Sequence, residues 1–177
     1  GAKGLAWFKV LSDGLQYKNS EKEEVDYNIE LIDLYDKFGQ DQKHLKTSRV
    51  LIEHFSKGNL NPEQIDILKY NVEKMSALIQ QQLVAKTYET QADVSEKKAM
   101  AANEYFMMSA LLSPEKAQKA YFHAGETHFA IGKFDKAIPM YAESIKRSQN
   151  NKDKETEKMA SNAMMVSLSK NVGQKTL

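Results

Sequence analysis

The sequence predicts an all-α protein of about eight helices, and three observations support this fold class. The 177 residues include only 3 Pro and 8 Gly, so chain breakers are few among many good helix formers. Apolar residues recur three and four positions apart in successive segments, as on the buried face of a helix. No segment alternates apolar and polar residues between turn signals, as a strand would. Antiparallel helices joined by short turns are therefore expected.

The first two helices are predicted from spacing and from a start signal. A first helix is marked by three apolar residues, Phe8, Leu11 and Leu15. Ser20 and Glu23 form the pair of a capping box, in which each side chain satisfies the other's backbone amide. A second helix is therefore expected to begin there and to end at Gly39, a residue suited to a left-handed stop.

The next two helices have comparable signals. Asp41 is the expected cap of a helix that ends at Lys57-Gly58. Asn61 and Gln64 repeat the capping box, with proline between them at the first helical position. From there the apolar spacing continues without Gly or Pro, which predicts one long helix near residues 62–93, about 45 Å in length.

The second half of the chain predicts four more helices. A segment over residues 95–112 is rich in Ala and Met, and Ser113-Pro-Glu115 resembles the earlier start signals. The helix that follows is expected to end at Ile131, before a turn at Gly132, and the next covers residues 133–148. A last helix follows Asp153. Pro139 lies inside one of these helices and predicts a kinked or tightened first turn.

Two glycines seven residues apart predict different local roles. Gly125 lies within a helix, where the missing side chain lets a neighbouring helix approach closely, and Ala137 is the expected residue opposite it. Gly132 lies between helices, where it can adopt the positive φ that the turn requires.

The pattern around these glycines resembles a tetratricopeptide repeat. Its residues are Tyr121, Ala124, Gly125, Phe129, Gly132, Phe134, Ala137, Ile138, Tyr141, Ser144 and Ile145. The match covers residues 118–149 and departs from the family pattern at His128 and Ser144. The resemblance implies hairpins stacked as an α-solenoid, with a diverged helical-hairpin region over 1–112 and a repeat-like region over 113–177 that ends in half a repeat.

Charge and composition limit the classes of partner that are expected, and they leave the compartment open. Lys plus Arg number 25 and Asp plus Glu number 24, so no basic stripe is expected for a nucleic acid. No apolar run is long enough to span a bilayer. The absence of cysteine fits both cytoplasm and periplasm. Gly1-Ala2 resembles a protease-cleavage scar, so the native N-terminus is expected to have been removed and the localisation stays open.

Catalytic and metal signals are weak. No phosphate-binding loop, nucleophile elbow or His-Glu-x-x-His motif is present. His123 and His128 are five residues apart, which places them on different sides of a helix and disfavours a shared metal ion. The sequence therefore predicts a protein that is not an enzyme and has no cofactor or metal.

The repeat resemblance implies a binding surface on one helical face. Its residues are Thr87, Gln91, Lys119, Phe122, Glu126, Phe129 and Met164. Phe122 and Glu126 stand where chaperone-binding family members carry Lys and Asn, which disfavours clamping of a terminal carboxylate. The predicted function is a scaffold that binds another protein or a peptide segment on a concave face.

Two alternatives stay open at this stage. Phe122 and Phe129 could pack against a neighbouring hairpin and take no part in binding. The chain could also be a structural segment of a larger assembly, in the cell envelope or in motility, that packs edge to edge and self-associates. Five methionines, Met107, Met108, Met159, Met164 and Met165, are expected in the core, with an adaptable binding surface as the alternative.

Overall fold

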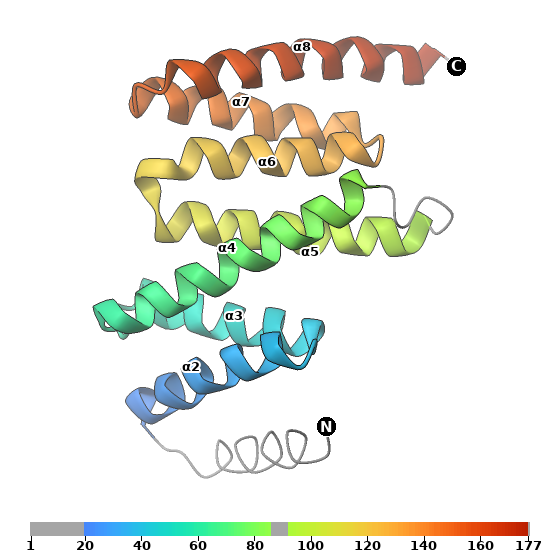
Figure 1. Ribbon diagram of the computed structural model, residues 1–177. Coiled ribbons are helices and arrows are strands. Elements are labelled where there is room, and N and C mark those ends of the chain that lie inside the picture. The colour runs from blue at the N-terminus through green and yellow to red at the C-terminus, as the bar shows by residue number, and fades with distance from the viewer. Residues whose placement is uncertain (1–19, 86–91, 177) are drawn as a thin grey trace. The chain divides into compact units, whose positions relative to one another are not determined.

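The computed structural model describes residues 20–85 and 92–176, and all regular structure in these ranges is helical (Figure 1). The helices are α2 (Glu21–Lys37), α3 (Asp41–Ser56), α4 (Pro62–Val84), α5 (Ala92–Leu112), α6 (Ala117–Ala130), α7 (Phe134–Asn150) and α8 (Lys154–Thr176), with a 3-10 turn over Pro114–Lys116 between α5 and α6. The all-α prediction is confirmed. The expected first helix at Phe8, Leu11 and Leu15 lies outside the described residues.

The residue contacts group the chain into two compact units that meet within α4. The first unit extends to Val72 and the second begins at Glu73. The expected sequence regions, 1–112 and 113–177, are not tested by this grouping and stay a prediction. Each unit is described by itself below.

The first unit combines α2, α3 and the first half of α4 around a small apolar core. Its most buried residues include Val25, Ile32, Leu51, Leu68 and Val72. A polar chain also crosses this core. The Nε2 of buried His44 lies 3.1 Å from Oδ1 of Asn71, and Nδ2 of Asn71 donates to Asp33 at 2.8 Å. Residues from all three helices are thereby joined by hydrogen bonds.

The second unit stacks α5, α6, α7 and α8 so that each helix contacts the next in sequence (Figure 1). Tyr105 and Tyr141 are the largest fully buried side chains in it. Small residues fill most of the remaining contacts, including Ala102, Ala124 and Ala160. Small side chains at helix contacts permit close approach of the two axes.

The helix starts confirm two predicted caps and correct two others. Ser20 accepts from the Glu23 amide at 3.2 Å. Asn61 and Gln64 form both bonds of the capping box, at 2.8 and 3.0 Å. Asp41 is wrong as a cap, because α3 begins at Asp41 itself and Gln40 holds the cap position. The Ser113 side chain makes no capping bond either, because a 3-10 turn intervenes before α6.

Four of the turns between helices have one residue in the left-handed conformation, and the α5–α6 connection has a 3-10 turn in its place. Gly132 has a φ of 75°, as predicted, and Gly39 shows the predicted left-handed stop at 65°. After Gly132, the Lys133 amide donates to the His128 carbonyl, five residues back, at 3.0 Å. The α7–α8 turn repeats this bond from Asp153 to Ser148 at 2.9 Å, but Lys152 holds the left-handed position with a φ of 56°. These bonds provide donors for backbone carbonyls at the helix ends that have no partner within the helix.

Two predictions about helix continuity need correction or refinement. The helix expected near 62–93 is wrong in length, since α4 ends at Val84 and α5 begins at Ala92. The apolar series stops after Leu83, and positions 86, 87 and 90 are Lys, Thr and Thr. A longer helix would therefore place polar groups on its core face. Helix α7 runs through Pro139, and its first turn is tightened by a bond from the Lys136 amide to the Lys133 carbonyl at 3.1 Å.

Candidate interaction surface

Gly125 lies at a close contact between α6 and α7, and the residue opposite it is Tyr141. A Cβ built on Gly125 would come within 2.5 Å of Cε1 of Tyr141. Gly125 therefore lies at a contact with the next helix, as predicted, but the nearest atoms there belong to the Tyr141 ring, so the prediction of a small residue, Ala137, opposite Gly125 is wrong. The aromatic ring itself fills the space that the glycine leaves open. Ala137 is also fully buried.

The Tyr141 ring is held by a polar contact from α6. Its hydroxyl donates to Oε1 of Glu126 at 2.5 Å. Burial raises the pKa of Tyr141, and the hydrogen bond and the negative charge of Glu126 raise that pKa further. The phenol therefore stays protonated, and it acts here as a structural donor.

The two aromatic residues of the predicted surface contact α7. The Phe122 ring centroid lies 5.9 Å from that of Tyr141, and the Phe129 ring stands edge-on to Phe134 at 5.1 Å. Both phenylalanines are half-buried. They therefore help to hold α6 against α7, and part of each side chain stays accessible to solvent.

The remaining predicted residues divide into described and undescribed positions. Lys119 is exposed on α6, Glu126 is half-buried, and Met164 is half-buried on α8. Thr87 and Gln91 lie outside the described residues. The structure thus brings Phe122 and Glu126 together around Tyr141.

Helix α8 carries an apolar surface that the sequence reasoning missed. Half of the exposed large hydrophobic residues of the described chain lie on this helix, namely Met159, Met165, Val166, Leu168 and Val172. Met165 and Val172 are 68% and 61% exposed. The expectation that Met159 and Met165 belong to the core is wrong, because they lie away from the buried face formed by Thr156, Ala160 and Ser167, whereas Met108 is buried as expected.

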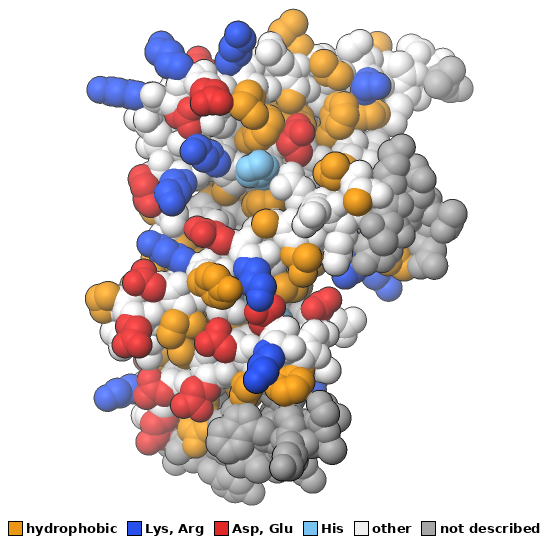
Figure 2. All heavy atoms as spheres, viewed as in Figure 1, with side chains coloured by type: hydrophobic (Ala, Val, Ile, Leu, Met, Phe, Trp, Pro, Cys, Tyr) orange, Lys and Arg blue, Asp and Glu red, His pale blue; other side chains and the backbone are white. Residues whose placement is uncertain are grey.

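The spacing on α8 was readable from the sequence. Met165, Leu168 and Val172 are separated by three and four residues, so they share one helical face. In the space-filling view, apolar side chains are visible among charged ones over α7 and α8 (Figure 2). We call Met165, Leu168 and Val172 the α8 apolar row.

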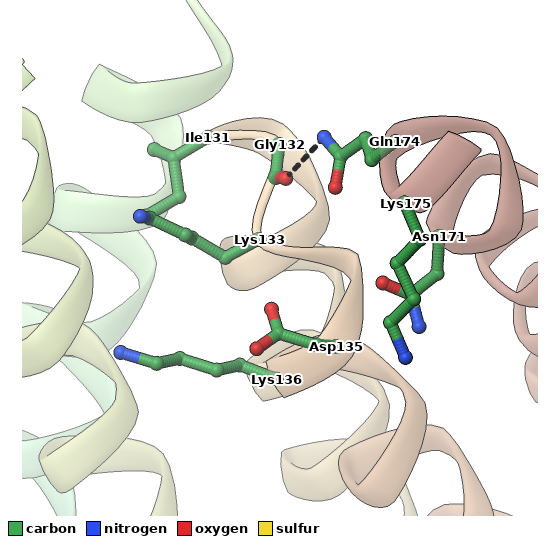
Figure 3. Close-up of a pocket in the computed structure, with 8 residues that line it drawn as sticks. All are labelled: Ile131, Gly132, Lys133, Asp135, Lys136, Asn171, Gln174 and Lys175. Atoms are coloured by element: carbon green, nitrogen blue, oxygen red, sulfur yellow. Dashed lines mark hydrogen bonds between the residues drawn. The ribbon is translucent and has the colours of Figure 1, made fainter. Parts of the chain in front are cut away.

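A lysine-lined pocket of about 480 Å³ lies between the α6–α7 turn and the end of α8 (Figure 3). Lys133 and Lys136 come from the start of α7, and Lys175 comes from α8. Asp135 supplies one opposing charge, and the Gln174 amide donates to the Gly132 carbonyl at 3.1 Å. None of the predicted binding residues lines this pocket.

A buried glutamine ties the other ends of three helices together. The main-chain carbonyl of Gln118 on α6 accepts from Ser144 of α7 at 2.7 Å, and its side chain donates to Asp153 at 3.1 Å. Asn151 donates to the same side chain at 2.6 Å. Asp153 caps α8 through the Thr156 amide at 3.0 Å, and bonds from Thr156 and Gln118 lower the pKa of Asp153.

The histidines are placed as packing groups. Burial lowers the pKa of both His123 and His128. The His123 ring stacks on Phe106 at 5.7 Å while the residue keeps an exposed edge, and Nε2 of His128 lies 3.0 Å from the Asn103 amide. Among the described residues, no group of three or more His, Cys, Asp or Glu side chains is placed to hold a metal ion.

Comparison with family models, curated proteins and solved structures gives no match to this chain. The tetratricopeptide resemblance therefore stays a prediction. None of the helices within 20–85 and 92–176 combines the length and the hydropathy of a bilayer-spanning segment.

Proposed function

We propose that this protein is a non-enzymatic scaffold whose stacked helices bind another protein. The observation that carries the proposal is the α8 apolar row together with Met159 and Val166. Exposed apolar side chains gathered on one element mark interaction surfaces more often than they occur without a role. Methionine side chains also adapt to the shape of a partner.

The binding surface that we propose combines α8 with the accessible edges on α6. Phe122 and Phe129 are fixed by their contacts with α7. A partner that covers their accessible edges therefore gains contact area without ordering those side chains first. Lys119 is exposed on the same helix and supplies a charge at the rim.

The α6 aromatics are unsuitable for a simple alanine test. Because both rings pack against α7, Phe122→Ala and Phe129→Ala would also lower the free energy of unfolding. Substitutions at exposed positions test binding without this loss of stability. We therefore choose Met165→Glu with Val172→Glu on α8, and Lys119→Glu on α6.

Cross-linking mass spectrometry of the full chain in its native cells tests the proposal. Lys158 precedes the α8 apolar row and Lys170 lies within its sequence span. Cross-links from these two lysines are expected to reach a partner and to weaken in the double α8 variant. Leu111→Glu is the matched control, because Leu111 is 56% exposed but belongs to α5. Equal loss of cross-links in the control and in the α8 variant would contradict the proposed surface.

Edge-to-edge packing into a larger assembly is the second candidate function. It is favoured by the same apolar row, since a helix with one face packed and an apolar face exposed suits a further layer of helices. Analytical ultracentrifugation separates the two functions. Concentration-dependent self-association that Met165→Glu abolishes supports edge-to-edge packing, whereas a monomer that captures a different protein supports the scaffold.

A further inference from the structure

A second pocket, of about 270 Å³, lies between α2 and α3, entirely within the first unit. On α2 its lining residues follow helical spacing, at Asn28, Leu31 and Tyr35. The lining residues of α3 do the same, from Lys43 to Val50. The pocket is thus the gap between two facing rows of side chains in one helical hairpin.

The interior of this pocket is mostly apolar. Leu31 and Tyr35 are buried, and Val50 is half-buried beside them. The volume is below the range of about 300–1,000 Å³ that is typical of sites for drug-sized ligands. One large apolar side chain is therefore a better fit than a whole small molecule.

Two buried polar side chains in the wall keep free hydrogen-bonding atoms. Asn28 is 7% exposed, and its Nδ2 donates to the Glu24 carbonyl at 2.8 Å. Its Oδ1 accepts no hydrogen bond from the described residues, and the Thr47 hydroxyl, on a residue that is 6% exposed, forms none with them. Neither atom is among the fully buried polar atoms that lack a partner in the described residues, so both remain accessible and can bond to water or to a ligand in the pocket.

Two lysines give the pocket a positive rim. Lys43 and Lys46 are exposed and lie one turn apart on α3, and Nζ of Lys43 stands 6.0 Å from the Tyr35 ring centroid. None of the ion pairs found among the described residues includes either lysine, and no acidic residue lines the pocket. The rim charge is therefore uncompensated within the lining.

We propose that this α2–α3 pocket binds a partner-protein segment in which a large apolar side chain is flanked by acidic residues. The apolar side chain enters between Leu31, Tyr35 and Val50. The flanking carboxylates pair with Lys43 and Lys46, and the backbone amides of the segment face Asn28 and Thr47. The site belongs to the first unit and is separate from the α6 and α8 surface.

The test titrates the full-length ¹⁵N-labelled protein with the blocked peptide acetyl-Gly-Asp-Phe-Glu-Gly-amide. Saturable chemical-shift changes are expected at α2 and α3 and nowhere on α7 or α8. A peptide with Ala in place of Phe and a peptide with Asn and Gln in place of the acids are both expected to bind much more weakly. Raising the salt concentration is expected to weaken binding of the parent peptide, because salt screens exposed charge pairs.

Charge variants test the role of the lysine rim. Lys43→Glu with Lys46→Glu is expected to weaken peptide binding about tenfold, because two exposed ion pairs are lost and the reversed charges repel the carboxylates of the peptide. The matched control is Lys22→Glu, which reverses an exposed charge on α2 outside the pocket and is expected to leave the affinity within about twofold. If the double reversal lowers the melting temperature, the neutral pair Lys43→Gln with Lys46→Gln replaces it. Val50→Phe fills the pocket and is expected to abolish the shifts.

Three results would overturn the proposal: equal binding of the Ala peptide, equal weakening by Lys22→Glu, or shifts spread over both units. Any of these would leave the scaffold function standing, because the α8 variants test that function on other residues. Conversely, peptide binding at α2–α3 with unchanged cross-links in the α8 variants would contradict the proposed α8 surface and support the proposed pocket.

Discussion

The Tyr141 ring occupies the space that a side chain at position 125 would need, so this position between α6 and α7 requires glycine. Gly125→Ala gains helix propensity of about 1 kcal/mol but forces the buried ring to move, which costs about 1–3 kcal/mol. We expect the free energy of unfolding to fall by up to about 2 kcal/mol, measured by urea denaturation.

Gly173→Ala is the control for this prediction. Gly173 also lies in a helix, but no atom comes within 4 Å of a Cβ built there. Only the propensity gain applies, so this variant is expected to be more stable than the parent by up to about 1 kcal/mol. If both variants shift stability in the same direction, the close contact is not what requires glycine at position 125.

At the residue scale, the sequence predicted types of contact better than their partners. A glycine within a helix indicated a contact with the next helix at position 125, which the structure has. That Tyr141 and not Ala137 stands opposite depends on the side-chain rotamer and on the bond to Glu126, which spacing does not encode. Both lysine-lined pockets were missed for the same reason, because they form only when residues distant in sequence meet.

At the scale of helices and turns, the α7–α8 connection uses lysine where other connections use glycine. The left-handed conformation costs a residue with a Cβ about 1–2 kcal/mol. Lys152→Gly removes this cost, and glycine's extra freedom in the unfolded chain offsets part of the gain. We expect a net increase of about 0.5–1 kcal/mol in the free energy of unfolding, measured with denaturant.

Lys152→Ala separates the conformational effect from the loss of charge. Alanine keeps the Cβ and therefore keeps the strain, so its stability is expected to stay within about 0.5 kcal/mol of the parent. Equal stabilisation by alanine and by glycine would assign the effect to the lysine charge.

The two start signals that looked alike in the sequence should respond differently to mutation. Asn61→Ala removes a bond that the structure shows at the start of α4, and we expect a loss of about 1 kcal/mol. Ser113→Ala removes no capping bond, and its effect is expected to stay within about 0.5 kcal/mol. Thermal unfolding followed by circular dichroism distinguishes them; a larger loss at Ser113 would contradict the assignment of caps.

Helix existence was predictable from apolar spacing, and helix ends were predictable only where a cap or a glycine marked them. The end of α4 carries no such mark, and its one indication in the sequence is that polar residues follow at the next core positions. Of the α8 apolar row, only Met165 was considered in the sequence, and it was expected in the core with an adaptable binding surface as the alternative. Its exposure depends on which face of α8 meets α7, which no single-helix pattern decides.

At the scale of the whole molecule, buried histidines make stability depend on pH. Burial lowers the pKa of His44 below 6.5, although Asn71 and the nearby charges of Asp36, Asp41 and Asp33 oppose this shift. His123 and His128 shift in the same direction. The unfolded chain therefore takes up protons at a higher pH than the folded chain does.

The consequence is a loss of stability on acidification. The contribution of these groups is complete above about pH 6.5, the value for the unfolded chain, and declines as the pH falls towards the lowered folded values. Urea denaturation at pH 7.5, 6.5 and 5.5 is expected to show this decline, with a shallower slope in His44→Gln. An identical slope in that variant would mean that His44 does not contribute to the pH dependence.

The bonds that centre on Gln118 have a dynamic consequence for the last three helices. Because one side chain holds the start of α6, the turn after α7 and the cap of α8, opening any of these ends breaks the contacts of the other two. Amide protons near these ends should then exchange with solvent through one shared opening event, and Gln118→Ala should divide that event into separate, faster ones.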